Sequence, residues 1–292
     1  MPTGRAVLFR LATSSQLERA VRALPGGEQR AWRGASRYVA GNTLGDALAA
    51  VQRLARHGVQ SSIDQFGELV QDAATADRVA TDYLKLADQL TTLPETTWLS
   101  VDLSHLGLDI DPQRCVEHLA AIASALPAGR RIQVGAEDYN RTDRVLDCVL
   151  AVAGRGLPDR LGATVQANFR RSSWDLDQLV SAGVHVRLVK GAYVEPPERA
   201  LPYGEATDIA YIHLAHRLAG ADAGFALATH DGLLREALLR ALGLRPVEQL
   251  LGVRPEVLDE LVTRGVPVRV YVPFGDDWFR YWMRRVAESR GA

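Results

Sequence analysis

Cysteine, net charge and long apolar runs are all scarce in this sequence. Its 292 residues include only two cysteines, Cys115 and Cys148, which argues against a disulfide framework and favours a reducing, cytoplasmic compartment. The formal net charge of −1 argues against nucleic-acid binding, which is typically accompanied by a basic domain or stripe. No apolar run approaches the roughly 18 residues of a membrane span, and residues 1–20 lack the apolar core of a signal peptide. We therefore expect no nucleic-acid partner and no transmembrane segment, with peripheral contact to the inner membrane left open.

Lysine is much rarer than arginine in this sequence. All but two of the 34 basic residues are arginine, and the exceptions are Lys85 and Lys190. This bias is typical of a GC-rich coding sequence, so a lysine marks a candidate position at which arginine cannot serve. Lysine carries a compact ammonium on a flexible stem, whereas the planar arginine fork never loses its proton. Lys85 lies in a helical stretch, Ala80–Leu93, and is expected to be solvated, which leaves Lys190 as the candidate functional residue.

Short apolar runs alternate with helical patterns after Gly58. The runs are rich in Val and Ile and have the length of buried strands. Such alternation predicts a parallel sheet, and eight strands without a G-x-G-x-x-G or G-x-x-x-x-G-K-[ST] motif favour a closed barrel over a doubly wound sheet. We therefore predict an α/β protein with a (βα)8 TIM-type barrel over residues 57–292, preceded by a helical arm over residues 1–56.

The expected elements can be placed by residue. Helices in the arm are expected at Leu17–Leu24 and Thr43–His57. Strands are expected at Val59–Asp64, Trp98–Leu103, Arg131–Val134, Leu161–Gln166, Val184–Val189, Phe225–Thr229 and Val266–Tyr271, with a further short one near Glu248–Leu251. Helices between and after them are expected at Asp111–Leu126, Arg141–Ala153, Leu176–Ser181, Asp208–Leu218, Leu233–Leu242, Pro255–Thr263 and Asp276–Arg290.

Polar side chains follow almost every expected strand. In a closed barrel the carboxyl ends of the strands and the loops after them form one rim, and function resides there. The residues at that rim are Asp64, Gln65, Glu68, Asp102, Ser104, His105, Glu137, Asp138, Gln166, Asn168, Lys190, Thr229, His230, Asp231 and Tyr271, with Tyr281, Arg284 and Arg285 added by the final helix. One polar strand end is routine, but the convergence of so many predicts a binding or catalytic site.

Several chemistries are open at this rim. His105 and His230 are possible metal ligands, but no H-x-H or H-E-x-x-H spacing occurs, so no metal site is expected. The absence of G-x-S-x-G argues against a serine nucleophile of that type. Lys190 at a strand end is compatible with a Schiff-base lyase, because a buried lysine can be tuned to a neutral amine. Arg284 and Arg285 stand among aromatic residues after the last strand and suit an anionic group held beneath an aromatic lid.

The motifs at the rim together resemble those of the proline dehydrogenase family, in its monofunctional bacterial form. The most specific are R-L-V-K-G-A-Y-V-E-P (Arg187–Pro196), A-T-H-D (Ala228–Asp231) and the stretch from Y-V-P-F-G to Y-W-M-R-R-V-A-E (Tyr271–Glu288). Supporting matches are R-Y-V-A-G (Arg37–Gly41), I-D-Q-F-G-E (Ile63–Glu68), L-S-H-L-G-L-D (Leu103–Asp109), A-E-D-Y-N-R-T-D (Ala136–Asp143), V-Q-A-N-F-R-R-S (Val165–Ser172) and L-L-G-V-R-P-E (Leu250–Glu256). They run in chain order at the strand ends already identified.

The resemblance implies non-covalent FAD across the barrel top and the oxidation of proline or a close cyclic amine. By this resemblance the flavin-contacting positions are Ala136, Gln166, Arg187, Lys190, Gly191, Ala192, Thr229 and His230. The substrate positions are Asp102, the aromatic walls Tyr271 and Tyr281, and the carboxylate-gripping pair Arg284 and Arg285; the expected catalytic groups are Arg187, Lys190 and Asp102. The implied reaction transfers a hydride from the ring carbon next to nitrogen to flavin N5. It gives a cyclic imine of the pyrroline-5-carboxylate type, and a quinone or another acceptor then reoxidises the flavin.

Two positions depart from the family pattern. The second strand typically ends in S-x-K-L, with a lysine that contacts the substrate carboxylate, but here it reads Ser100-Val101-Asp102-Leu103. The third strand typically ends in an active-site Asp, and the aligned residue here is Gly135. We expect Asp102 to weaken carboxylate binding by about 1–4 kcal/mol and to pair with Arg284, Arg285 or a substrate ammonium. The space at Gly135 suits a bulkier substrate.

Three functions therefore stand side by side. The first is a flavoenzyme that oxidises proline, or a related cyclic amine in a specialised biosynthetic pathway. The second is a Schiff-base lyase that uses Lys190, and the third is a non-catalytic flavin binder that has lost two active-site groups. The sequence gives no indication of oligomeric state or of whether the N-terminal arm covers the site.

Overall fold

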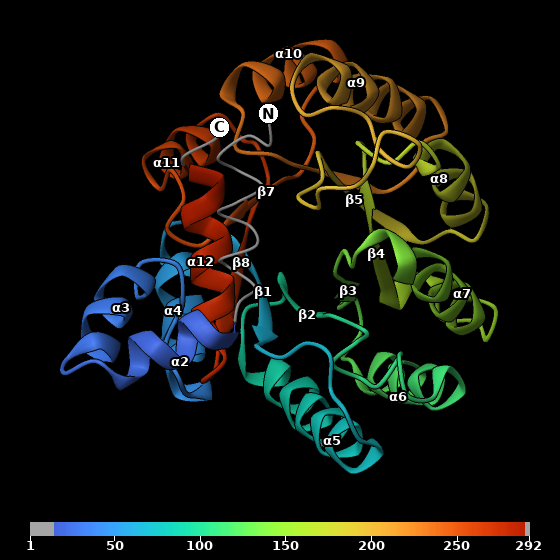
Figure 1. Cartoon of the computed structure of the whole chain (residues 1–292). Coiled ribbons are helices and arrows are strands. Elements are labelled where there is room, and N and C mark those ends of the chain that lie inside the picture. Colours follow the sequence, from blue (N-terminus) through green and yellow to red (C-terminus); the bar gives the residue numbers. More distant parts are fainter. Residues whose placement is uncertain (1–14, 290–292) are drawn as a thin grey trace.

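Eight parallel strands close into a barrel in a computed structural model that describes residues 15–289 (Figure 1). Each strand pairs with the next, and β8 pairs with β1 in the register Gln60↔Arg269 to Gln65↔Phe274. The strands are β1 (Gln60–Gln65), β2 (Thr97–Val101), β3 (Ile132–Val134), β4 (Leu161–Gln166), β5 (His185–Val189), β6 (Phe225–Ala228), β7 (Val247–Leu250) and β8 (Val268–Phe274). The predicted α/β barrel is confirmed.

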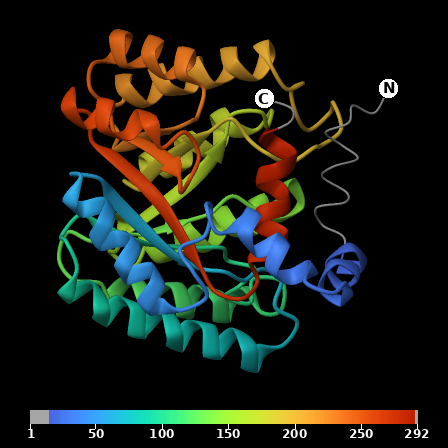
Figure 2. The same cartoon turned by 90° about the vertical axis from the view of Figure 1, so that its left-hand side faces the viewer.

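Helices from α4 to α11 ring the barrel and cover its outer face, whereas α2, α3 and α12 pack together beside the others (Figures 1 and 2). The helices are α2 (Ser15–Ala23), α3 (Gly27–Ala35), α4 (Leu44–Arg56), α5 (Ala73–Gln89), α6 (Pro112–Ala125), α7 (Thr142–Ala153), α8 (Ser172–Ser181), α9 (Glu205–Gly220), α10 (Gly232–Leu242), α11 (Glu256–Thr263) and α12 (Trp278–Ser289). Aspartates cap three of them, because the side chains of Asp72, Asp111 and Asp231 accept from the backbone N–H three residues on. Over the described residues, no helix combines the length and apolarity that crossing a membrane needs.

The ends of several elements differ from the prediction. Helix α8 begins four residues before the expected start, and α12 begins at Trp278 rather than Asp276. Strand β8 continues past Tyr271 to Phe274, although it contains Pro273. Proline has no N–H to donate. Its carbonyl still accepts from the Ala40 N–H at 2.9 Å, so a backbone hydrogen bond holds the strand at Pro273.

A second, smaller hydrophobic cluster joins α3 to α12. Its buried members are Ala31, Ala35, Val39, Trp278, Phe279 and Tyr281. Trp32 of α3 meets Trp278 edge to face, with ring centroids 5.1 Å apart. No helix was predicted at α3, which lies beside α12 in Figure 1. The last helix is thus held by packing against the N-terminal segment, while the domain boundary at residue 57 stays a prediction.

A buried arginine fills the amino-terminal end of the barrel. Arg269 stacks over the Trp98 ring at 3.4 Å and donates to the Ser61 carbonyl at 2.7 Å and to the Gln60 side chain at 2.6 Å. Burial lowers its pKa to about 9. This end is therefore closed by packed side chains, and the opposite end is left to form a site.

Candidate active site

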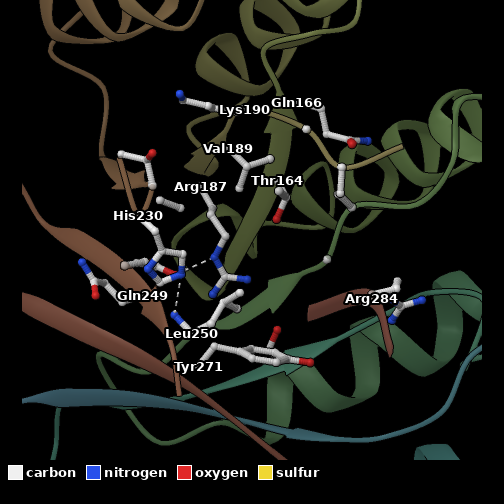
Figure 3. Close-up of a pocket in the computed structure, with 18 of the residues that line it drawn as sticks. Thr164, Gln166, Arg187, Val189, Lys190, His230, Gln249, Leu250, Tyr271 and Arg284 are labelled. Atoms are coloured by element: carbon white, nitrogen blue, oxygen red, sulfur yellow. Dashed lines mark hydrogen bonds and ion pairs between the residues drawn. The ribbon is translucent and has the colours of Figure 1, made fainter. Parts of the chain in front are cut away.

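A cavity of about 320 Å³ opens at the carboxyl ends of the strands (Figure 3). Every residue predicted to contact the cofactor or the substrate lines it: Asp102, Ala136, Gln166, Arg187, Lys190, Gly191, Ala192, Thr229, His230, Tyr271, Tyr281, Arg284 and Arg285. They come from β2 to β6, from β8, from the loops after these strands and from α12. The structure brings these residues together, and their roles stay predictions.

Lys190 follows β5 and lies between two carboxylates. Its Nζ is 2.6 Å from Asp208 Oδ1 on α9 and 2.7 Å from Asp231 Oδ2. Asp231 also caps α10, because its Oδ1 accepts from the Leu234 N–H at 3.0 Å. Burial alone would lower the pKa of Lys190, but the two carboxylates outweigh it and raise that pKa. The amine is held as a charged ammonium, which is the opposite of what Schiff-base chemistry requires.

Arg187 on β5 and Glu248 on β7 form a deeply buried ion pair. Arg187 Nε donates to Glu248 Oε2 at 2.5 Å, and their side chains are 10% and 5% exposed. Figure 3 shows the Arg187 guanidinium directed into the cavity. Glu248 was not among the residues predicted from the sequence to form the site. An acidic residue inside a short strand that is buried in the barrel is the signal that could have identified it.

Asp64 lies at the end of β1 between two tyrosine hydroxyls. Tyr83 of α5 donates to Asp64 Oδ1 at 2.8 Å, and Tyr271 of β8 donates to Oδ2 at 2.8 Å. Burial raises the pKa of Asp64 to about 7, and the two tyrosine hydrogen bonds and the Arg187 charge offset only part of that effect. Tyr83 was not among the predicted site residues, because only the solvated Lys85 was considered in this stretch; Tyr83 lies on the buried face of α5 and is fully buried.

Replacing Asp64 with asparagine is expected to stabilise the protein, relative to wild type, increasingly between about pH 4 and about pH 7. In that range the folded protein keeps the Asp64 proton, whereas the unfolded chain has lost it near the ordinary pKa of 3.8. The folded state therefore binds one more proton, and this group lowers the free energy of unfolding by about 1.4 kcal/mol for each unit of rising pH. Denaturant unfolding across the range measures the difference, with Asp88→Asn, at an exposed position of α5, as the matched control. A constant difference between wild type and Asp64→Asn contradicts the raised pKa.

Helix α12 places two arginines and a tyrosine over the cavity. Arg284 Nη1 donates to Glu68 Oε2 at 2.9 Å, and Arg285 lies over the Tyr281 ring with its Cζ 5.0 Å from the centroid. Burial alone would lower the pKa of Arg284, but the Glu68 carboxylate raises it. The ion pair expected between Asp102 and Arg284 is not found in the part of the chain that the structure describes, because Arg284 is bound by Glu68 instead. The alternative partners of Asp102, which are Arg285 and a substrate ammonium, stay predictions.

Asp102 occupies the space that a side chain at position 135 would need. A Cβ added to Gly135 would lie 1.9 Å from Asp102 Oδ1. Burial raises the pKa of Asp102 well above its ordinary value, and the Glu137, Asp64 and Glu68 carboxylates raise it further against the lowering effect of Arg284. Burial and these neighbouring carboxylates therefore disfavour the charged form of Asp102.

The sequence is similar to proteins of one known family. The family model described as "Proline dehydrogenase" matches residues 47–292. The chain is 33% identical over 264 residues to proline dehydrogenase 1 of Bacillus subtilis, covering 87% of this chain and 86% of that protein. It is 30% identical over 296 residues to proline dehydrogenase of Deinococcus radiodurans, covering 98% and 94%.

Solved structures match the fold. Proline utilization A from Bdellovibrio bacteriovorus, inactivated by N-propargylglycine, superposes with a TM-score of 0.82 at 18% identity, covering 98% of this chain and 36% of that one. A mutant of proline utilization A from Bradyrhizobium japonicum gives 0.75 at 23% identity, with 94% and 32% covered. This chain spans about a third of the length of those proteins. With a family model that matches most of its length and relatives at 30–33% identity, the chain belongs to the proline dehydrogenase family.

Proposed function

We propose that this chain uses non-covalently bound FAD to oxidise proline or a closely related cyclic secondary amine to the cyclic imine. The observation that carries the proposal is the convergence of Lys190, Arg187, Arg284 and Arg285 on one cavity at the mouth of a barrel of this family. Cationic groups at such a mouth suit a cofactor that carries phosphate groups and gains negative charge on its ring during reduction, and they can donate hydrogen bonds to an oxygen of the substrate.

Polar atoms of the cavity fit a flavin ring. Gln166 Nε2 donates to the Glu137 carbonyl at 2.9 Å, which directs Gln166 Oε1 elsewhere as an acceptor. Among the described residues, neither Gln166 Oε1 nor Arg187 Nη2 has a hydrogen-bond partner, although both are buried. A flavin ring presents both donors and acceptors at its edge, and buried polar atoms without partners are rare in proteins. When bound, FAD supplies at N5 the acceptor for the hydride that leaves the substrate carbon.

Gly191 lets the backbone lie close to such a ring. Its φ is +106°, a conformation that favours glycine, and a Cβ there would lie 1.9 Å from Asn168 Oδ1. Lys190, held by Asp208 and Asp231, places a fixed ammonium beside this backbone and can stabilise negative charge on the reduced cofactor.

Tyrosines and arginines form the remaining substrate walls. The rings of Tyr271 and Tyr281 lie 6.0 Å apart between centroids and offer apolar faces to a small ring. Arg284 and Arg285 follow Tyr281 on α12, and Arg285 lies over its ring, so both arginines can bind an oxygen of the substituent next to the ring nitrogen.

Asp64 can receive the proton that the substrate nitrogen must lose. A protonated nitrogen has no lone pair to stabilise the carbon from which a hydride departs. Asp64 lines the cavity beside Tyr271, whose hydroxyl donates to it, and its pKa of about 7 allows proton exchange near neutral pH. Asp64→Asn is expected to slow flavin reduction roughly 10²-fold or more and to remove an inflection near pH 7 from its pH profile. An unchanged profile, measured by stopped-flow mixing, contradicts this role.

The electron acceptor and the location of the protein follow from the same proposal. A flavin reduced by an amine must be reoxidised, and we assign this step to a quinone or another acceptor. The cytoplasm, with or without peripheral contact to the inner membrane, is the proposed compartment.

Anaerobic addition of cyclic amines to the purified, FAD-loaded protein tests the proposal. Bleaching of the yellow flavin band by a cyclic secondary amine supports it. A colourless protein that is trapped covalently at Lys190 by borohydride with a carbonyl substrate would instead identify a lyase. Bound FAD that no secondary amine reduces would identify a non-catalytic flavin binder.

A further inference from the structure

Asp102 and Gly135 form one structural unit at the ends of β2 and β3. Because Asp102 Oδ1 lies 1.9 Å from the position of a Cβ at residue 135, its carboxyl can occupy this place only while residue 135 is glycine. Both residues line the cavity. The absence of a side chain at one position therefore allows a carboxyl from the neighbouring strand to face the ligand.

The surroundings of Asp102 are acidic. Glu137 after β3, Asp64 on β1 and Glu68 after β1 each raise the pKa of Asp102, and Arg284 of α12 is the nearby cation that lowers it. Three tyrosines, Tyr83, Tyr193 and Tyr271, also face this carboxyl closely enough for Asp102 to raise their pKa values. Arg284 is already bound by Glu68 at 2.9 Å, so its charge is largely compensated before any ligand binds.

The cavity thus presents an acidic group on one side and basic groups on the other. Asp102 offers a carboxyl on the β2–β3 side, whereas Arg285 and Arg284 offer donors on the α12 side. A substrate carboxylate satisfies only the second side and sets a negative charge near the acidic residues. A carboxamide satisfies both, because its carbonyl accepts from arginine and its N–H₂ donates to Asp102.

Resting on the proposed function, we propose that Asp102 is a specificity-determining residue that selects a cyclic secondary amine whose substituent next to the nitrogen is uncharged and carries a hydrogen-bond donor. L-Prolinamide is the simplest compound of this class, and L-proline is its charged counterpart. Gly135 is the positioning residue that leaves room for the Asp102 carboxyl.

Binding without turnover gives the first readout. Tetrahydrofuran-2-carboxamide and tetrahydrofuran-2-carboxylate have an oxygen in place of the ring nitrogen, so they cannot be oxidised to an imine. Titration of the FAD-loaded protein with each, followed by the change in the flavin spectrum, is expected to show the carboxamide binding roughly tenfold tighter or more at neutral pH. As the pH rises, carboxylate affinity is expected to fall, since a bound carboxylate favours the protonated form of Asp102, while carboxamide affinity stays level.

Variants then connect the preference to Asp102. Asp102→Asn keeps the size of the side chain and is expected to abolish the pH dependence of carboxylate binding. Asp102→Lys is expected to reverse the preference, and Gly135→Ala is expected to reduce it by displacing the Asp102 carboxyl. Asp88→Lys, at an exposed position of α5, makes the same charge change away from the cavity and is expected to leave both affinities unchanged.

The outcomes separate this inference from the proposed function. A carboxylate that binds as tightly as the carboxamide, with a ratio that Asp102→Asn and Asp102→Lys do not alter, overturns the inference while flavin reduction by proline still upholds the proposed function. Failure of the protein to bind FAD, or of any cyclic amine to reduce it, overturns the proposed function itself. Flavin reduction by L-prolinamide that exceeds reduction by L-proline in kcat/KM supports both.

Discussion

Replacing Arg187 with methionine is expected to lower the free energy of unfolding by about 3–5 kcal/mol. The substitution leaves Glu248, whose side chain is 5% exposed, as a buried carboxylate without the guanidinium that binds it at 2.5 Å. Glu248→Met alone should cost a similar amount, since it leaves the arginine buried and uncompensated. Chemical denaturation followed by circular dichroism measures both effects.

The double variant Arg187→Met/Glu248→Met separates stability from function. Two methionines of similar volume remove both charges together, so stability is expected to return to within about 1–2 kcal/mol of wild type. Flavin reduction is not expected to return, because Arg187 Nη2, which lacks a partner among the described residues, is the atom proposed to face the cofactor. A double variant as unstable as the single ones contradicts the ion-pair explanation, and a fully active double variant contradicts the proposed role of Arg187.

Replacing Lys190 with methionine is expected to weaken FAD binding by about 10- to 1,000-fold. The substitution removes the ammonium but leaves Asp208 and Asp231, so the backbone next to the flavin faces two uncompensated carboxylates. Unit charges a few Å apart interact by about 1–4 kcal/mol at the dielectric of a protein surface, which corresponds to that range of affinity. Quenching of free FAD fluorescence during titration of the apoprotein measures the dissociation constant.

The other lysine of the chain provides the matched control for this experiment. Lys85 is 69% exposed on α5 and pairs with Asp82 at 2.8 Å, so Lys85→Met is expected to leave FAD affinity unchanged. Lys190→Arg keeps the charge, but a planar fork cannot reproduce a compact ammonium lying 2.6 and 2.7 Å from two carboxylates on different elements. Its FAD affinity is expected to fall between those of wild type and Lys190→Met. Equal affinity in all of these variants contradicts a role for Lys190 at the cofactor.

The barrel and the membership of its rim could be predicted because both follow from local pattern. Strand β4 was predicted at Leu161–Gln166 and lies there, since both of its ends are marked by a change in hydrophobicity. The closed barrel fixes which strand ends meet, so residues as distant in sequence as Asp102 and Arg284 could be assigned to one rim.

The partners of these residues could not be predicted, because they depend on three-dimensional packing. Arg284 pairs with Glu68 rather than with Asp102, and the spacing of residues in the sequence does not predict which of two carboxylates on neighbouring loops binds it. Tyr83 reaches Asp64 from the buried face of α5, and Glu248 on β7 binds Arg187 on β5, two strands away. The steric relation of Asp102 to Gly135 likewise arises from two adjacent strand ends and needs coordinates to be seen.

A single-turnover reaction tests the central claim most directly. The purified protein, loaded with FAD and kept free of oxygen, is mixed with L-proline and separately with L-prolinamide, and both the flavin band and the mass of the small molecule are followed. We expect one equivalent of flavin to bleach for each equivalent of a product two hydrogens lighter than the amine, with L-prolinamide the faster substrate. Flavin that stays oxidised with both compounds, or that bleaches without formation of the imine, contradicts the assignment of this cavity to cyclic-amine oxidation.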